Sequence, residues 1–155
     1  MKVKKQALLI GASGGLGSAT TDLLSNSGWH VFASDINPSI PDHYKQSANI
    51  TPLVMDVTDT ESIQEAFKQI SARTTSLDAV IHVAGILRVG SLIELPVPEV
   101  EKVLQINLLG VYRVNQIFLP LLLHQKGRVI ILSSEIARQS AAPFNGAYSI
   151  SKHAL

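Results

Sequence analysis

The sequence predicts an α/β fold in which helices cover both faces of a parallel sheet. Short, continuous apolar runs alternate with longer segments of helical spacing along the chain, which is the pattern of strand–helix–strand units. The first apolar run ends in a cluster of glycines, as expected where a buried strand turns into a helix. No internal repeat and no linker-like segment divides the 155 residues, so we expect one domain over 1–155.

The first half of the chain contains strands and helices in strict alternation. We expect strands at 7–10, 29–34 and 53–55, because each is a short apolar run bounded by turn residues. A helix over 16–27 closes at Gly28, and its apolar side carries Leu16, Ala19, Leu23 and Leu24. Residues 37–49, which include two prolines, are predicted to be a loop. Asp59 is placed to cap a further helix that carries Ile63, Ala66, Phe67 and Ile70 inward.

The second half continues the alternation and ends within a helix. We expect strands at 79–83 and 128–132 and a long helix between them. Pro98 suits the first turn of that helix, which runs to Leu123 and bends near Asn107 or Gly110. A last helix begins at about residue 145 and is cut off at Leu155. The sequence therefore predicts a sheet that is truncated after its fifth strand and the start of the following helix.

The composition excludes several classes of protein. Hydrophobic residues make up 46% and charged residues 16% of the chain, which is typical of a globular protein and not of a disordered one. A net charge of +1 gives no field that would attract nucleic acid. Since there is no cysteine, disulfides, thiolate catalysis and cysteine metal sites are excluded, and we assign no metal site. The apolar run 117–123 is far shorter than the roughly 20 residues of a bilayer span, so we expect a cytoplasmic protein without membrane contact.

The glycine cluster at residues 11–17 lies between the first strand and the first helix. Glycines there let the backbone approach a pyrophosphate, and the helix N-terminus offers free N–H groups and a partial positive charge. The spacing fits two motif registers, both of which begin at Gly11 and end at Gly17, with Gly15 or Gly14 between them. We expect the phosphate contacts to come from Gly11, Ser13, Gly14, Gly15, Leu16 and Gly17.

Carboxylates follow the second and third strands. Asp35 can accept hydrogen bonds from the adenosine ribose hydroxyls and would repel a 2′-phosphate, and no Arg or Lys stands beside it. The cofactor is therefore expected to be NAD, with NADP less favoured; a plain turn carboxylate is the alternative. Asp56 ends the third strand and suits either a hydrogen bond to the adenine amino group or a turn and capping role.

A tyrosine and a lysine, Tyr148 and Lys152, lie four positions apart and share one face of the last helix. A free phenol has a pKa near roughly 10. A nearby ammonium stabilises the phenolate, so such a tyrosine becomes a usable general acid or base. Ser134, near the end of the fifth strand, could hold a substrate oxygen, or it could simply cap the strand. Asn107 lies in an otherwise apolar helical stretch, where a buried amide requires hydrogen-bond partners.

Together these residues resemble the short-chain dehydrogenase/reductase family, over essentially the whole chain. The resemblance implies a Rossmann-type, doubly wound fold, hydride transfer between NAD and an alcohol or carbonyl substrate, and a homo-oligomer, either dimer or tetramer. It implies that Tyr148 is the catalytic acid/base and that Lys152 binds the nicotinamide ribose. It further implies that Ser134 orients the substrate oxygen and that Asn107 supports a proton relay through water. The expected cofactor contacts are completed by Val57, Ala84 and Gly85, together with Tyr148 and Lys152.

The sequence also departs from the usual pattern of this family. Ile10 stands where threonine is usual, and residues 82–85 read His-Val-Ala-Gly where Asn-Asn-Ala-Gly is usual. The interval from Ser134 to Tyr148 is one position longer than usual. His82 and the register through Gly14 resemble the nucleotide-sugar epimerase and dehydratase branch, which stays open as an alternative function. An NAD(P)-binding module without turnover is a further alternative, because the expected fold is truncated.

Overall fold

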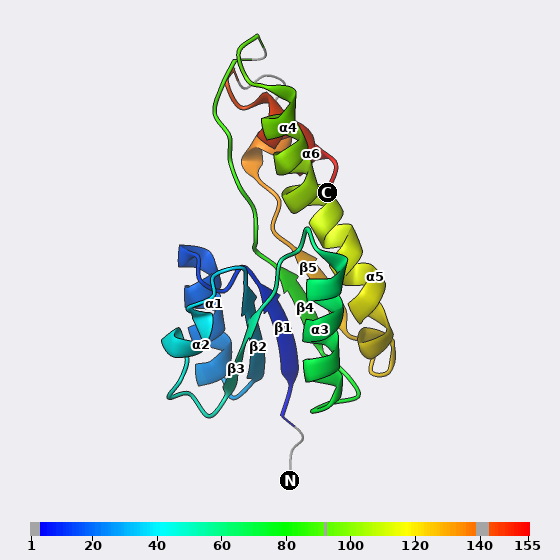
Figure 1. The fold of residues 1–155 in the computed structure, drawn as a ribbon. Coiled ribbons are helices and arrows are strands. Elements are labelled where there is room, and N and C mark those ends of the chain that lie inside the picture. Colours follow the sequence, from blue (N-terminus) through cyan, green and yellow to red (C-terminus); the bar gives the residue numbers. More distant parts are fainter. Residues whose placement is uncertain (1–3, 92, 139–142) are drawn as a thin grey trace.

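The computed structural model describes residues 4–91, 93–138 and 143–155. In these residues all the strands pair in parallel in one sheet of order β3-β2-β1-β4-β5 (Figure 1). The strands are β1 (Gln6–Ile10), β2 (His30–Asp35), β3 (Ile50–Val54), β4 (Ala79–His82) and β5 (Arg128–Ile131). The parallel, doubly wound α/β fold expected from the sequence is confirmed.

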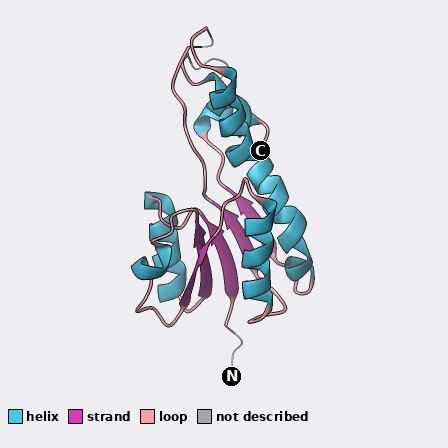
Figure 2. Cartoon of the chain, viewed as in Figure 1, coloured by secondary structure: helices cyan, strands magenta, loops and turns pink. Residues whose placement is uncertain are grey.

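The helices lie on both sides of this sheet and beyond its carboxyl edge (Figure 2). They are α1 (Gly15–Asn26), α2 (Ile40–His43), α3 (Thr60–Ser71), α4 (Val97–Leu104), α5 (Gly110–Leu123) and α6 (Gly146–His153). A π-helical turn, Gln105–Leu109, joins α4 to α5, and a 3-10 turn, Glu135–Arg138, follows β5. Helices α4 and α6 project past the strand ends, whereas α1, α2, α3 and α5 flank the sheet (Figure 1).

Each face of the sheet has its own apolar core. In β1, Leu8 and Ile10 belong to the core under α3 and α5, while Ala7 and Leu9 belong to the core under α1 and α2. Successive side chains of a strand point to opposite faces, so a strand buried on both faces needs an unbroken apolar run. This explains why the strands of this chain read as continuous apolar runs.

Helix α1 turns a different side to the sheet than the sequence predicts. Leu16 and Leu23 are 64% and 67% exposed, and Ala19 is exposed as well, whereas Gly17 and Thr21 are buried. Gly17 lies against the backbone of Gly11 and Ala12, directly after β1, which puts position 17 and the position one turn later on the buried side of the helix. The apolar side of the helix, which carries Leu16, Ala19 and Leu23, is therefore not the side that packs on the sheet.

The predicted loop at 37–49 contains the short helix α2. Ile40 is fully buried and Tyr44, which follows the helix, is nearly so. The two residues are four positions apart and so share one face, which packs into the core beside β2 and β3. The two prolines conceal this helix in the sequence, although one of them occupies its first turn, where proline is tolerated.

Other local predictions are confirmed. The Asp59 carboxylate accepts a hydrogen bond from the Glu61 N–H at 2.9 Å and so caps α3. Ile63, Ala66 and Ile70 are buried in the core. The long helix does change its winding around Asn107, at the π-helical turn.

The helical segment Val97–Leu123 is 27 residues long and, by length and composition alone, apolar enough to span a membrane. The apolar run 117–123, which by itself is too short for a bilayer span, is only the last part of this segment. Core helices of soluble proteins satisfy the same criterion, and the inner side of α5 packs in the sheet core through Val114, Phe118, Leu121 and Leu122. That packing gives the apolar side chains of α5 a role within the fold itself.

Candidate active site

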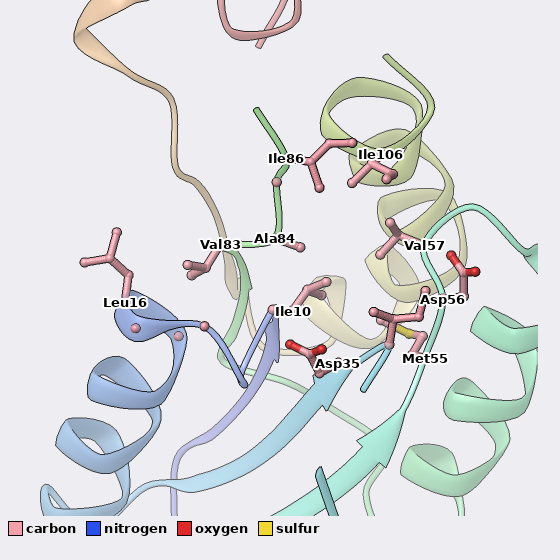
Figure 3. Close-up of a pocket in the computed structure, with 16 residues that line it drawn as sticks. Ile10, Leu16, Asp35, Met55, Asp56, Val57, Val83, Ala84, Ile86 and Ile106 are labelled. Atoms are coloured by element: carbon pink, nitrogen blue, oxygen red, sulfur yellow. The ribbon is translucent and has the colours of Figure 1, made fainter. Parts of the chain in front are cut away.

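The strand order reverses between β1 and β4: from β1 the chain adds β2 and β3 on one side, and from β4 it adds β5 on the other. In open α/β sheets the crevice outside the carboxyl ends of the strands at such a point is the ligand site. A cavity of about 470 Å³ lies there. Figure 3 shows Leu16 and the glycine loop on one side of it and Met55, Asp56 and Val57 on the other.

Most of the residues predicted to bind a cofactor line this cavity. They are Gly11, Gly14, Gly15, Leu16, Gly17, Asp35, Asp56, Val57, Ala84 and Gly85. The cavity lining also contains six residues that were not predicted from the sequence, namely Ile10, Ile36, Met55, Val83, Ile86 and Ile106. Five of the six stand at or just after the carboxyl end of a strand, so their position along the chain was the available signal.

Two glycines of the loop are sterically required. Gly11 has φ +93°, and a methyl group on it would lie 2.6 Å from the Ala84 nitrogen. A methyl group on Gly17 would lie 1.9 Å from the Gly11 carbonyl oxygen, whereas one on Gly15 would meet nothing within 4 Å. Both motif registers share Gly11 and Gly17, so packing within the protein does not choose between Gly14 and Gly15.

The amide groups of the loop divide into two sets. Those of Gly11 and Ala12 donate to the Ser34 carbonyl at 2.9 and 3.0 Å, and that of Ser13 donates to the Asp35 carboxylate at 2.9 Å. The N–H groups of Gly15, Leu16 and Gly17 belong to the first turn of α1, where a helix supplies no acceptor. These three amides at the cavity are therefore the ones available to a phosphate.

Asp35 lies beside the glycine loop. Its carboxylate accepts hydrogen bonds from the Ser13 and Asn37 amides, at 2.9 and 3.0 Å. A carboxylate has about four acceptor sites, so capacity remains for ribose hydroxyls. The loop and the carboxylate, which are far apart in the sequence, are direct neighbours in space. Ser13, by contrast, turns its amide to Asp35 and is not part of the cavity lining.

Asp56 stabilises the turn after β3 and also lines the cavity. One of its carboxylate oxygens accepts hydrogen bonds from the Thr58 N–H and hydroxyl, at 2.8 and 2.7 Å. Its own N–H donates to the Ser62 hydroxyl at 2.9 Å. This is the turn role that the sequence left open, and the residue also lines the cavity where it was expected.

Asn107 connects three parts of the molecule. Its side chain accepts a hydrogen bond from the Ile86 N–H at 2.8 Å and donates to the Ile86 carbonyl at 2.9 Å and to the Ser151 hydroxyl at 3.0 Å. The π-helical turn turns this amide inward, and Arg113 donates to the Gln105 carbonyl of that turn at 3.2 Å. A polar residue in an apolar helix thus joins the segment after β4 to α6.

Lys152 is buried close to Asn107. Its ammonium donates to the Leu132 carbonyl at 2.8 Å and lies 5.7 Å from the centre of the Tyr148 ring. Burial lowers the pKa of the Lys152 ammonium from its ordinary value. A methyl group on Gly85 would lie 3.3 Å from Asn107 Oδ1 and 3.6 Å from Lys152 Nζ. Gly85 lines the cavity, whereas Tyr148 and Lys152 are not part of its lining, so the Lys152 ammonium lies beside the cavity at this glycine.

Ser134 lies beyond the end of β5, which stops at Ile131. Its hydroxyl accepts a long hydrogen bond of 3.4 Å from the Ile136 N–H, as in a local cap. The neighbouring Ser133 hydroxyl donates to the Lys152 carbonyl at 3.0 Å and so ties this segment to α6. Residues 139–142, within the interval from Ser134 to Tyr148, lie outside the described residues.

His82 is a core residue here. It is buried at the end of β4, and its Nε2 lies 2.9 Å from the Asn115 side-chain oxygen on α5. Burial lowers the pKa of His82, against the opposing effect of this hydrogen bond. The side chain pairs with α5 and is not part of the cavity lining.

Comparison with known proteins agrees with this geometry. The family described as short chain dehydrogenase matches residues 5–155, which is nearly the whole chain. The chain belongs to the short-chain dehydrogenase family. It is an oxidoreductase family whose members bind a nicotinamide cofactor and act on small molecules.

Relatives within the short-chain dehydrogenase family differ in their reactions. The chain is 29% identical to the 3-oxoacyl-[acyl-carrier-protein] reductase FabG of Thermotoga maritima over 96% of its own length and 62% of that protein. It is 32% identical to the NADPH-dependent 1-acyldihydroxyacetone phosphate reductase of Schizosaccharomyces pombe, of which it covers 52%. The structure of ElxO with NADP bound matches with a TM-score of 0.85 and 25% identity, over 98% of this chain and 64% of that one. The chain thus spans between half and two thirds of the length of these relatives.

Proposed function

We propose that residues 1–155 form an NAD-binding domain of an oxidoreductase that transfers a hydride between NAD and an alcohol or carbonyl substrate. The observation that carries this proposal is the contact between the glycine loop and Asp35, with 2.9 Å between the Ser13 nitrogen and the carboxylate. A diphosphate on the amides of Gly15 to Gly17 would have its adenosine ribose within reach of Asp35. The open space at Gly15 fits this group, since the backbone is free to meet a phosphate there.

The proposed catalytic roles are those that the resemblance to the family gives to Tyr148, Lys152, Ser134 and Asn107, and the contact of Lys152 with the Tyr148 ring supports the first two. When bound, NAD⁺ supplies the acceptor for the hydride that leaves the carbinol carbon as an alcohol becomes a carbonyl. Tyr148 takes the hydroxyl proton, and the ammonium of Lys152 stabilises the phenolate and holds the nicotinamide ribose. Ser134 orients the substrate oxygen. Asn107 holds the segment at Ile86 and supports the return of the proton through water.

The preference for NAD is tested by titrating the chain with NADH and with NADPH. The Asp35 carboxylate would bond the ribose hydroxyls and repel a 2′-phosphate, so we expect NADH to bind at least about tenfold more tightly. The variant Asp35→Asn keeps an oxygen for the Ser13 amide and loses the charge, so the discrimination between NADH and NADPH should shrink. Asp42→Asn is the matched control, because Asp42 is an exposed carboxylate paired with Lys45 outside the cavity lining.

Equal or tighter binding of NADPH by the wild-type chain would contradict the NAD assignment. This outcome must be tested because the relatives include an NADPH-dependent reductase and a protein with NADP bound. Failure of the folded chain to bind either cofactor would contradict the proposal as a whole. Binding without NADH formation from secondary alcohols would favour a dinucleotide-binding module. The hydrogen bond between the buried His82 and Asn115 weakens one of the two features on which the nucleotide-sugar epimerase alternative rests, and the other feature, the glycine register through Gly14, stays open.

The cellular setting is part of the same proposal. We place the protein in the cytoplasm as a homo-oligomer that acts on a small molecule, without nucleic acid or membrane partners. Size-exclusion chromatography with light scattering tests the oligomeric state directly, and a purely monomeric protein at micromolar concentration would contradict it.

A further inference from the structure

Tyr44 lies beneath the glycine loop, although it follows a helix on the flank of the sheet. Only 6% of its surface is exposed, and it belongs to the same apolar core as Ala12 and Ile40. The His43 ring meets the Tyr44 ring edge-on, with 4.6 Å between their centres and 90° between their planes. Ring packing therefore fixes where the phenol hydroxyl can point.

The Tyr44 hydroxyl donates a hydrogen bond to the Ala12 carbonyl oxygen at 3.2 Å, out of contact with solvent. Every other inter-element bond found in residues 11–13 goes to the end of β2, at Ser34 or Asp35. The bond from Tyr44 is the one that fixes the loop from α2. Burial raises the pKa of Tyr44 from its ordinary value, so the hydroxyl keeps its proton throughout the neutral range.

The shape of the loop leaves little freedom once the Ala12 peptide is fixed. Gly11 takes a positive φ and closes against Ala84, and Gly17 lies against the Gly11 carbonyl. Rotation of the Ala12 carbonyl would turn the Ser13 amide away from Asp35 and move the start of α1. The amides of the first turn of α1 are the ones left for a phosphate, so their direction depends on the same peptide.

We propose that Tyr44 is a positioning residue for dinucleotide binding, which holds the loop so that the Gly15, Leu16 and Gly17 amides point at the diphosphate. This inference rests on the proposed function, because it needs a dinucleotide in the cavity. Tyr44 itself does not touch the ligand and is not part of the cavity lining. Its effect should therefore be confined to ligands that carry phosphate.

The test compares ligands with and without the diphosphate on the variant Tyr44→Phe, which removes the hydroxyl and keeps the ring. We expect the affinity for NADH and ADP-ribose to fall about five- to tenfold, the effect of losing one buried hydrogen bond. The affinity for adenosine, which has no phosphate, should stay unchanged. Amide exchange at residues 13–17 should become faster in the ligand-free variant.

Ile40→Val is the matched control, because it removes a methyl group from the same core and leaves the bond to Ala12 in place. Ile40→Val should lower the midpoint of urea unfolding about as much as Tyr44→Phe does. It should leave the affinity for ADP-ribose and the amide exchange at residues 13–17 as in the wild type. The positioning role of Tyr44 is contradicted if Tyr44→Phe binds ADP-ribose as tightly as the wild type. It is also contradicted if Ile40→Val lowers the affinity for ADP-ribose as much as Tyr44→Phe does. A wild-type chain that binds no dinucleotide would instead overturn the proposed function.

Discussion

The glycines of the loop differ in whether the surrounding backbone leaves room for a side chain. The sequence marks Gly11, Gly14, Gly15 and Gly17 alike, yet only Gly11 and Gly17 have no room for a side chain. The reason lies in how the backbone folds, since the atoms that exclude a methyl group belong to the Gly11 carbonyl within the loop and to Ala84 in the segment after β4. Spacing in the sequence shows that a tight loop exists and cannot show which of its glycines face protein and which face ligand.

Gly17→Ala should destabilise the protein by about 1–3 kcal/mol, because a methyl group there meets backbone that cannot move aside. Gly15→Ala is the matched control: it meets nothing within 4 Å and lies in the first turn of α1, so the free energy of unfolding should stay the same or rise by up to about 1 kcal/mol. Urea unfolding followed by circular dichroism measures both. Equal losses in the two variants would contradict the contact described for Gly17.

The buried His82 and the half-buried His30 give a second prediction at this scale. Burial lowers the pKa of His82, and burial together with the charges of Lys4 and Arg73 lowers that of His30. In the unfolded chain both rings take up a proton near about pH 6.5. The unfolded state then binds more protons than the folded state, so the free energy of unfolding should fall as the pH drops below about 6.5.

His82→Gln should reduce this loss of stability between pH 7.5 and 5.5, a range above the titration of ordinary carboxylates. Glutamine keeps a side-chain amide that can reach toward Asn115 and has no proton to gain. The exposed His124→Asn serves as a control and should retain the full pH dependence, since it leaves His30 and His82 in place. The measurement is urea unfolding across the pH series, and a flat wild-type profile would contradict the prediction.

At the scale of elements, the π-helical turn between α4 and α5 carries a buried polar side chain, Asn107, that binds two other segments. The sequence predicts a bend near Asn107 because a buried amide interrupts an apolar helix. In the structure a π-helical turn widens the helix at this place, and the amide meets Ile86 and Ser151. The partners could not be named beforehand, because one lies after β4 and the other on α6, and no local pattern connects them.

Asn107→Ala should cost on the order of 3 kcal/mol of stability, because it removes the partner of the part-buried N–H and carbonyl of Ile86 and of the buried Ser151 hydroxyl. We also expect faster amide exchange in α6, which loses its bond through Ser151. The control Gln116→Ala removes an exposed amide from the same long helix and should change stability by less than about 0.5 kcal/mol. An Asn107→Ala protein as stable as the control would show that this amide does not join the elements.

Two elements also show where helical spacing misleads. Leu16 and Leu23 lie on the apolar side of α1, yet both are largely exposed, and the buried positions of this helix are Gly17 and Thr21. The helix α2 was hidden by its prolines, although Ile40 and Tyr44 share one buried face. In α1 the buried side is the one where Gly17 approaches the loop backbone, and in α2 it is the side of two apolar residues that the prolines obscure in the sequence.

On the scale of the whole molecule, the sheet is covered unevenly. β1 lies at its centre and is buried on both faces, whereas β5 forms an edge at which Ile130 is 49% exposed among the described residues. The chain spans between half and two thirds of the relatives compared with it. The cavity nevertheless has both of its walls, because β1, β2, β3 and β4 all lie within this chain.

The sequence by itself determined the order of strands and helices, the parallel sheet, the glycine loop and the carboxylate beside it, because each depends on local periodicity or on chain order. Only the tertiary structure decided which glycines are packed against protein, which side of α1 faces the sheet, and that Tyr44 and Asn107 bind distant backbone groups. Those features arise from contacts between segments far apart in the chain. Such contacts form only when the sheet has brought the segments together, so no pattern within either segment specifies its partner.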